Sequence, residues 1–143
     1  MPKLERSIEI NAPSSRVREV LTDPELIPKW NITVKEISNL EPNKGTVKSN
    51  VGDFTFKVMD QVENNKIIVE VDHPEFSGYG YILNDKEDLT ELSYWVDYKQ
   101  ITREKIQARS LNILLNEIKN FTEFLEDGGD PEEYTRKQIL VNP

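Results

Sequence analysis

The sequence predicts an α+β fold in which an antiparallel β-sheet packs against one long C-terminal helix. Residues 102–126 contain no Gly or Pro and place apolar side chains at helical spacings of three and four. The run DGGDP at 127–131 follows at once, and this composition favours the end of a helix. Residues 32–100 alternate apolar and polar side chains between short polar turns, which is typical of an antiparallel meander.

An opening strand and two short helical segments are predicted before the meander. Residues 4–10 alternate, with Leu4, Arg6, Ile8 and Ile10 in one phase. Pro13 suits the first turn of a helix, because the N–H that it lacks would have no partner there. The apolar side of this helix consists of Val17, Val20 and Leu21. A second helical turn is expected over residues 24–27, ending at Pro28.

Six strands form the predicted meander. Their expected ranges are 32–40, 46–51, 54–63, 66–73, 76–83 and 89–100. Alternation assigns one face of these strands to the long helix. The residues assigned to that face are Phe54, Phe56, Val58, Ile67, Val69, Val71, His73, Tyr79, Tyr81, Leu83, Leu92, Tyr94, Val96 and Tyr98. In the strand 76–83 the opposite phase, with Gly78, Gly80 and Ile82 inward, is the alternative.

The long helix supplies an apolar stripe that needs cover from the sheet. Its members are Leu111, Leu114, Ile118, Phe121 and Leu125, widened by Ile106 and Leu115. The polar residues Glu117, Lys119 and Glu123 are assigned to the solvent face. At about 1.5 Å per residue this helix crosses a whole small domain.

Composition narrows the class of protein. The length of 143 residues favours one domain over residues 1–129, with a short tail at 130–143. A net charge of −8 argues against nucleic acid as a partner. With no Cys and one His, neither a disulfide nor a metal site is expected. No apolar run approaches the ~20 residues of a membrane span, and the start MPKLERSIEI lacks a signal-peptide core, so we expect a cytoplasmic protein without stable membrane insertion.

Three local motifs occur within this order of elements. They are IEINAP at 8–13, LTDPE at 21–25 with PKW at 28–30, and TELSYWVDY at 90–98. Over about residues 3–126 the chain thereby resembles the SRPBCC superfamily, the START-like proteins that include polyketide cyclase/dehydrase-like members. One departure is the charged turn at 85–88, where many relatives carry glycines.

The resemblance implies a helix-grip fold, in which a curved antiparallel sheet wraps around the C-terminal helix and two short helices follow the first strand. Relatives hold lipids, sterols or aromatic polyketides in a cavity between sheet and helix. Binding or carriage of a hydrophobic small molecule is therefore the leading hypothesis, without a cofactor. The alternatives are a cyclase/dehydratase-type enzyme using the same cavity and a co-chaperone-like protein-interaction module. The pocket candidates are Trp30, Phe54, Phe56, Val69, Val71, His73, Tyr79, Tyr81, Tyr94, Tyr98, Leu111, Leu114 and Ile118.

Each polar candidate also has a structural interpretation. The four inward tyrosines could orient a ligand through their hydroxyls, or simply pack in the core. His73 could act as a general base or pH-sensitive donor, or be a hydrogen-bonded structural residue. Arg6 could hold a ligand carboxylate at the mouth, or pair with an acid such as Asp60. Asp60 itself is an acid/base candidate unless a β-bulge turns it outward. These residues do not add up to a convincing catalytic constellation.

Trp95 is a large aromatic residue that the alternation predicts on the outer face of the sheet. It lies in the phase opposite to Tyr94 and Val96 in the last strand. Cover for its ring could come from a homodimer contact or from residues 139–141 of the tail.

Overall fold

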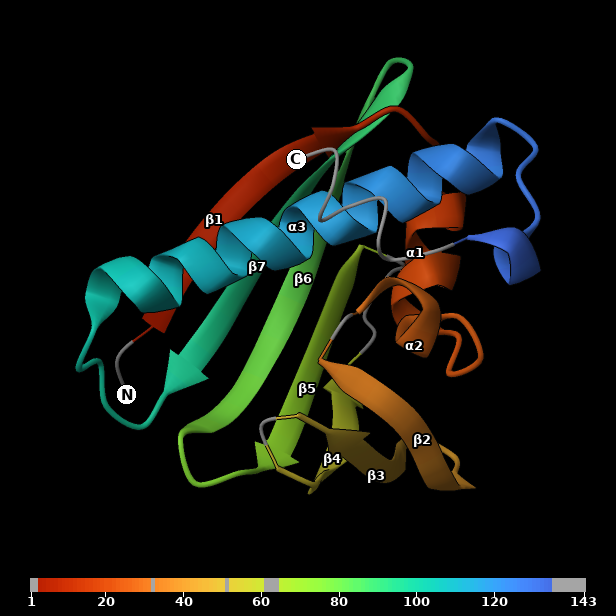
Figure 1. The fold of residues 1–143 in the computed structure, drawn as a ribbon. Coiled ribbons are helices and arrows are strands. Elements are labelled where there is room, and N and C mark those ends of the chain that lie inside the picture. Colours follow the sequence, from red (N-terminus) through yellow and green to blue (C-terminus); the bar gives the residue numbers. More distant parts are fainter. Residues whose placement is uncertain (1–2, 32, 51, 61–64, 135–143) are drawn as a thin grey trace.

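The computed structural model describes residues 3–31, 33–50, 52–60 and 65–134. These residues form one seven-stranded sheet, two short helices and one long helix that crosses the sheet (Figure 1). The strands are β1 Lys3–Ile10, β2 Val34–Glu41, β3 Lys44–Ser49, β4 Phe54–Asp60, β5 Lys66–Asp72, β6 Phe76–Lys86 and β7 Leu89–Tyr98. The helices are α1 Ser14–Thr22, α2 Ile27–Trp30 and α3 Glu104–Glu126, followed by one 3₁₀ turn at Pro131–Glu133.

The sheet is an open antiparallel meander of β2 to β7, to which the first strand is added at one edge. Its order is β1-β7-β6-β5-β4-β3-β2, and every neighbouring pair is antiparallel. The first strand therefore lies beside the last, and α3 packs across these two strands while α1 and α2 lie nearer its C-terminal end (Figure 1). This is the helix-grip arrangement that the resemblance implies.

Two turns are tighter than the sequence indicated. The expected five-residue turn at 41–45 is reduced to Pro42-Asn43, with Glu41 opposite Lys44. Asn43 has a φ of 67°, a conformation that Asn tolerates and that a tight turn after proline requires. The expected turn at 84–88 is likewise shorter, because β6 continues to Lys86 and pairs with Leu89. The charged residues at the end of β6 can belong to a strand because their side chains remain in solvent.

The second short helix is displaced from its predicted position. The expected turn at 24–27 ending at Pro28 is wrong, since α2 runs from Ile27 to Trp30 and contains Pro28 in its first turn. Proline is compatible with that position because the first N–H groups of a helix have no partner within it. The shift places Trp30, which is buried, at the end of α2.

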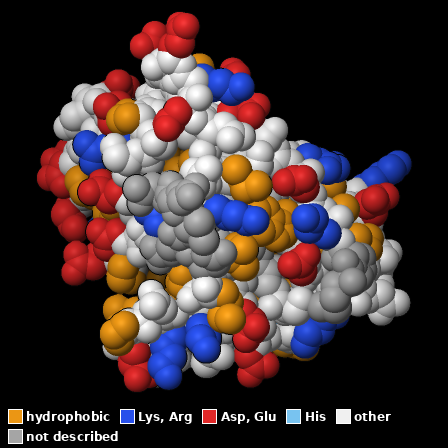
Figure 2. All heavy atoms as spheres, turned by 180° about the vertical axis from the view of Figure 1, so that it is seen from behind, with side chains coloured by type: hydrophobic (Ala, Val, Ile, Leu, Met, Phe, Trp, Pro, Cys, Tyr) orange, Lys and Arg blue, Asp and Glu red, His pale blue; other side chains and the backbone are white. Residues whose placement is uncertain are grey.

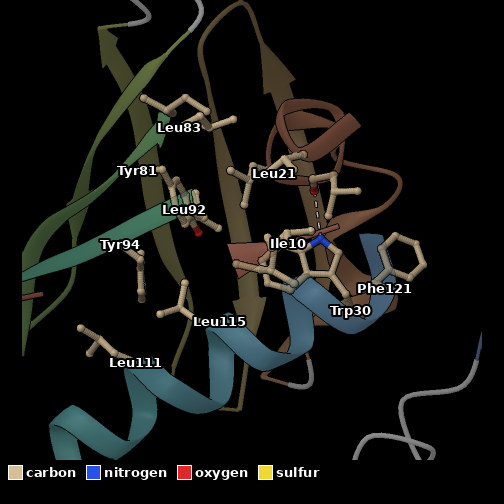
Figure 3. Close-up of a cluster of buried hydrophobic side chains, with 14 of the residues drawn as sticks. Ile10, Leu21, Trp30, Tyr81, Leu83, Leu92, Tyr94, Leu111, Leu115 and Phe121 are labelled. Atoms are coloured by element: carbon tan, nitrogen blue, oxygen red, sulfur yellow. Dashed lines mark hydrogen bonds between the residues drawn. The ribbon is translucent and has the colours of Figure 1, made fainter. Parts of the chain in front are cut away.

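Trp30 joins the two short helices through a hydrogen bond. Its Nε1–H donates to the carbonyl oxygen of Val20 at 2.9 Å (Figure 3). The residue four positions after Val20 is Pro24, which has no N–H to donate. The indole therefore satisfies a carbonyl that the end of α1 leaves without a helical partner.

The C-terminal part of α3 carries most of the helix's buried side chains. Those residues are Leu111, Leu115, Glu117, Ile118, Phe121, Thr122 and Leu125, with Ala108 buried one turn earlier. Figure 3 shows Leu115 and Phe121 facing the short helices and the sheet. Two assignments are wrong: Ile106 is 57% exposed, and Glu117, expected in solvent, is 2% exposed.

Lys119 and Glu123 also differ from their prediction, because they connect α3 to the end of β1. The Lys119 ammonium lies 2.6 Å from a Glu123 carboxylate oxygen and donates to the Glu9 carbonyl at 2.8 Å. Glu123 in turn accepts from the Asn11 N–H at 2.8 Å. These contacts fix the chain where it leaves the sheet and turns into α1.

The segment after α3 folds back onto the helices. Gly128, at a φ of 91°, follows the end of α3, and Glu132 forms an ion pair with Lys29 of α2 at 3.0 Å. The Tyr134 ring lies 4.8 Å from that of Phe121 and 5.0 Å from that of Phe124. Residues 139–141, one predicted cover for Trp95, lie outside the described residues.

Trp95 occupies the predicted outer face, and the ring is 8% exposed. It lies directly over Gly80, so closely that a Cβ on that glycine would collide with the indole. The Lys3 ammonium lies 5.3 Å from the ring centroid. The inward phase of Tyr79, Tyr81 and Leu83 is thus confirmed, and a homodimer contact at Trp95 stays a prediction.

Candidate functional site

A cavity of about 1090 Å³ separates the first half of α3 from the outer strands of the sheet. It opens to solvent on one side. Its walls come from α1, α2, α3 and strands β2 to β7, so nearly every element contributes. The reason is visible in α3: its C-terminal half packs in the core, whereas residues 104–110 bury only Ala108.

Ten of the thirteen predicted pocket residues line this cavity. They are Trp30, Phe54, Phe56, Val69, Tyr79, Tyr81, Tyr94, Tyr98, Leu111 and Leu114. They come from six elements, and Figure 3 shows Tyr81 and Tyr94 on the sheet with Leu111 across from them on α3. Their part in binding a ligand stays a prediction.

Val71, His73 and Ile118 do not belong to the lining. Ile118 is fully buried in the half of α3 that packs in the core. Val71 is buried opposite Phe56 in the β4–β5 ladder. Both are buried in the core cluster and do not border the cavity.

His73 lies just beyond the end of β5 in an aromatic cluster. Its ring stacks on Phe76, with centroids 4.2 Å apart, and meets the edge of Phe54 at 5.5 Å. Its Nδ1 accepts a hydrogen bond from the Glu75 N–H at 3.0 Å. This nitrogen is therefore occupied by the backbone, and the geometry is that of a structural histidine supporting two rings that line the cavity.

Three tyrosines form a cluster on the sheet side of the cavity. The rings of Tyr81 and Tyr94 stack, and Tyr79 meets both edge-on at centroid distances of 5.8 and 6.2 Å. Burial raises the pKa of Tyr79 to about 12 and raises the pKa values of Tyr81 and Tyr94 well above their usual range. Each phenol is therefore a neutral O–H group at physiological pH.

The hydroxyls of this cluster are available to a guest molecule. Among the described residues, none of the three forms a hydrogen bond to protein, and none is sealed off from the cavity. A hydroxyl in this state can donate to a carbonyl or hydroxyl oxygen of a ligand. The cluster thus combines aromatic surface with three hydrogen-bond donors.

Entry was expected past Trp30 and the loops at 52–53 and 74–75, and of these Trp30, Pro74 and Glu75 belong to the lining. Sequence reasoning missed one wall of the cavity and the polar residues of α3 beside its mouth. The missed apolar residues include Leu21, Ile27, Val34, Ile37, Leu40 and Val47. On α3 the lining also includes Arg103, Gln107 and Ser110, which precede Leu111 and Leu114 on the same helical face. Continuing the apolar stripe toward the N-terminus regardless of polarity would have found these three.

The remaining ionisable groups of the lining lie at the mouth. Glu41, Lys44, Glu75, Lys99 and Arg103 are all exposed. Arg6 is not part of the lining; it is exposed and donates to the Glu5 carbonyl. A register shift between Val58 and Asp60 marks a bulge at the predicted place, and the Asp60 side chain lies outside what the structure describes.

Two further classes of site are absent from the described part of the chain. No group of three or more His, Cys, Asp or Glu side chains is placed to hold a metal ion. No helix there is long and apolar enough to cross a membrane.

Comparison with known proteins agrees with this architecture. Residues 1–99 match the family described as polyketide cyclase / dehydrase and lipid transport. The chain belongs to this family. In sequence it matches no curated protein.

Solved structures share the fold at low sequence identity. A START superfamily protein from Mycobacterium smegmatis is 18% identical with a TM-score of 0.75, covering 86% of this chain and 98% of that one. The Aha1 dimer from Colwellia psychrerythraea gives 17% identity and a TM-score of 0.70, covering 84% and 95%. The di-domain ARO/CYC BexL of the BE-7585A biosynthetic pathway gives 12% and 0.70, covering 88% of this chain but 48% of its own. The chain thus belongs to the polyketide cyclase / dehydrase and lipid transport family and has a START-like helix-grip fold. Both findings are compatible with ligand binding and with cyclase roles.

Proposed function

We propose that this protein binds and carries a hydrophobic small molecule of the lipid, sterol or aromatic polyketide type in the cavity between its sheet and α3. The observation that carries the proposal is the cavity itself. Its volume of about 1090 Å³ slightly exceeds the roughly 300–1,000 Å³ typical of small-molecule sites. Side chains that could have filled it, such as Leu114 and Tyr79, instead border it half-buried.

The chemistry of the walls supports an apolar guest with few polar atoms. Aliphatic and aromatic side chains dominate the interior, while the charged residues of the lining are exposed at the mouth. Transfer of apolar surface from water to such walls supplies roughly 25 cal/mol per Å². The hydroxyls of Tyr79, Tyr81 and Tyr94 then fix the orientation of a guest that carries an acceptor oxygen.

Catalysis of the cyclase or dehydratase type is the competing use of the same cavity. Proton transfer needs a group whose pKa lies near the working pH and which reaches the reacting atom. Among the described lining residues, the buried ionisable groups are tyrosines whose pKa values are raised. This arrangement favours carriage, because such phenols donate hydrogen bonds but do not accept a proton.

Uptake of the neutral fluorescent dye Nile red tests the proposal with two adjacent variants. Leu114 lines the cavity, whereas Ile113 is 44% exposed and does not belong to the lining. Leu114→Trp fills the space and is expected to weaken dye binding by at least about tenfold, as expected when a guest loses much of its apolar contact area. Ile113→Trp, the matched control, is expected to bind like the parent protein.

Urea unfolding of both variants confirms that each remains folded. The proposal is overturned if the folded parent protein takes up no apolar dye, or if both tryptophan variants bind it equally well. Native mass spectrometry of the gently purified protein then identifies any lipid that it retains.

A further inference from the structure

The mouth of the cavity carries two cationic side chains without an ion pair. Lys99, in the loop after β7, and Arg103, at the start of α3, both line the cavity and are exposed. Among the described residues neither lies within ion-pair distance of a carboxylate. Lys44, the third cation of the lining, is by contrast 3.5 Å from Glu41.

These two cations stand out because the chain as a whole is acidic. Its net charge is −8, and Figure 2 shows acidic side chains gathered along the edge beyond the C-terminal end of α3, on the left. Exposed acids of that end are Glu25, Glu126, Asp127, Asp130, Glu132 and Glu133. Lys99 and Arg103 lie near the opposite, N-terminal end of α3, at the opening of the apolar cavity.

The lining also contains a buried hydrogen-bond donor at the end of β7. Tyr98 immediately precedes Lys99, lines the cavity and is 9% exposed, and its hydroxyl forms no hydrogen bond to a described residue. The first turn of α3 has no side-chain cap, so its N–H groups add partial positive charge on the same side. Together these groups offer two cations and one neutral O–H donor to an anion at the mouth.

Glu75 is the opposing charge in this region. It lines the mouth, and its carbonyl accepts the Lys99 N–H at 3.0 Å. Burial, and then the Glu75 carboxylate, raise the pKa of Tyr98. Among the described lining residues outside the Lys44–Glu41 pair, two cations thus face one acid, and Glu104 in the first turn of α3 is a further acid beside the lining. Removal of the Glu75 charge is expected to strengthen any anion site.

We propose that the guest is an amphiphile whose apolar body occupies the cavity while an anionic end group, a carboxylate or a phosphate, is held at the mouth by Lys99 and Arg103. This inference rests on the proposed function, because it assigns the polarity and direction of the ligand in the same cavity. The planar guanidinium of Arg103 offers paired donors that match both end groups. The interior hydroxyls remain available to a neutral oxygen further along the guest.

Three ligands of equal chain length test the proposal by displacement of Nile red. They are hexadecanoate, hexadecyl phosphate and the neutral hexadecanol. Both anions are expected to bind the parent protein about tenfold more tightly than the alcohol at low salt, since hydrogen bonds to charged groups are about twice as strong as neutral ones. A preference for one anion over the other identifies the end group.

Four variants assign the preference to the mouth. Arg103→Gln and Lys99→Gln are each expected to weaken both anions about fivefold while leaving hexadecanol unchanged, as for a partly exposed charge contact. Glu75→Gln is expected to strengthen both anions. Arg109→Gln, which removes an exposed cation of α3 outside the lining, is the matched control and is expected to change nothing.

Salt supplies an independent measurement, because the Debye length falls from about 30 Å at 0.01 M to about 3 Å at 1 M. The anion preference is expected to shrink over this range, while hexadecanol binding is not weakened. Equal binding of anions and alcohol, or an equal loss in Arg103→Gln and Arg109→Gln, overturns the anion site. If neither anion nor alcohol displaces the dye, the carrier function itself fails for this ligand length, which is a separate result.

Discussion

The rings of Tyr81 and Tyr94 stack across neighbouring strands, with centroids 5.0 Å apart and planes inclined by 21°. These residues are directly opposite each other in the β6–β7 register, so the sheet itself holds the pair in place. Burial raises the pKa of both phenols; the Tyr94 phenol raises that of Tyr81 further, and the Tyr79 phenol acts on both. A charge on either ring would have to exist in an apolar wall beside a second potential anion.

The tyrosine cluster is therefore expected to make the protein unstable in alkali. The unfolded chain ionises its phenols near pH 10, whereas the folded state keeps them protonated, to about pH 12 for Tyr79. Above about pH 10 the folded state thus binds more protons, and the free energy of unfolding falls on the order of 1 kcal/mol per pH unit for each such phenol. Urea unfolding between about pH 8 and 11 measures this fall, which Tyr79→Phe should make shallower. A free energy of unfolding that does not decrease above about pH 10 contradicts the prediction.

Replacement of Trp30 by Phe is expected to destabilise the protein by about 2–3 kcal/mol. The variant loses the hydrogen bond to the Val20 carbonyl and leaves a gap where the larger ring was buried. Equilibrium unfolding in urea gives the change in free energy. Because Pro24 cannot replace the lost donor, a change below about 0.5 kcal/mol would show that the Val20 carbonyl has found water instead.

A side chain at position 80 is expected to displace Trp95. Gly80→Ala places a Cβ against the indole, and such overpacking costs about 1–3 kcal/mol. In a Trp95→Leu background the same substitution should cost less, because the ring that it meets is gone. A double-mutant cycle measures this coupling. Equal costs in the two backgrounds would mean that the indole moves aside freely.

The Tyr134 hydroxyl is expected to be dispensable while its ring is not. Among the described residues this buried hydroxyl has no hydrogen-bond partner, and burial raises the pKa of the phenol to about 12. Tyr134→Phe removes an unsatisfied polar group and should stabilise the protein by up to about 1 kcal/mol. Tyr134→Ala removes the contacts with Phe121 and Phe124 and should destabilise it by about 2 kcal/mol. Thermal unfolding of the two variants is expected to move in opposite directions.

The strands and their inward faces were predictable because alternation is a direct consequence of the extended backbone. Tyr79 and Tyr94 face the cavity side for this reason, and Gly80, against which Trp95 packs, faces the outer side. Turn lengths were less accessible, since tight turns depend on single backbone angles such as the positive φ of Asn43. The position of α2 likewise depended on whether Pro28 ends a helix or begins one.

A cavity between sheet and helix could be predicted from the sequence, but its boundaries could not. A periodic pattern indicates which way a side chain points, but not how far away the facing element lies. Ile118 and Leu111 belong to one stripe, yet one is packed in the core and the other borders the cavity. The burial of Glu117 was not predictable from helical periodicity either, because the facing elements come from distant parts of the chain; Tyr134, 17 positions later, lies close enough for Glu117 to raise the pKa of its phenol.

The helix α3 is long enough that its C-terminal turns pack in the core while its N-terminal turns border the cavity. Ile118, Phe121 and Leu125 lie in the packed interior, whereas Ile106 and Ser110 border the opening with little burial of their own. Under the proposed function, substitutions in the first two turns are therefore expected to alter which guest is accepted at little cost to folding. On the same basis, related proteins could bind different ligands while keeping the same packed core.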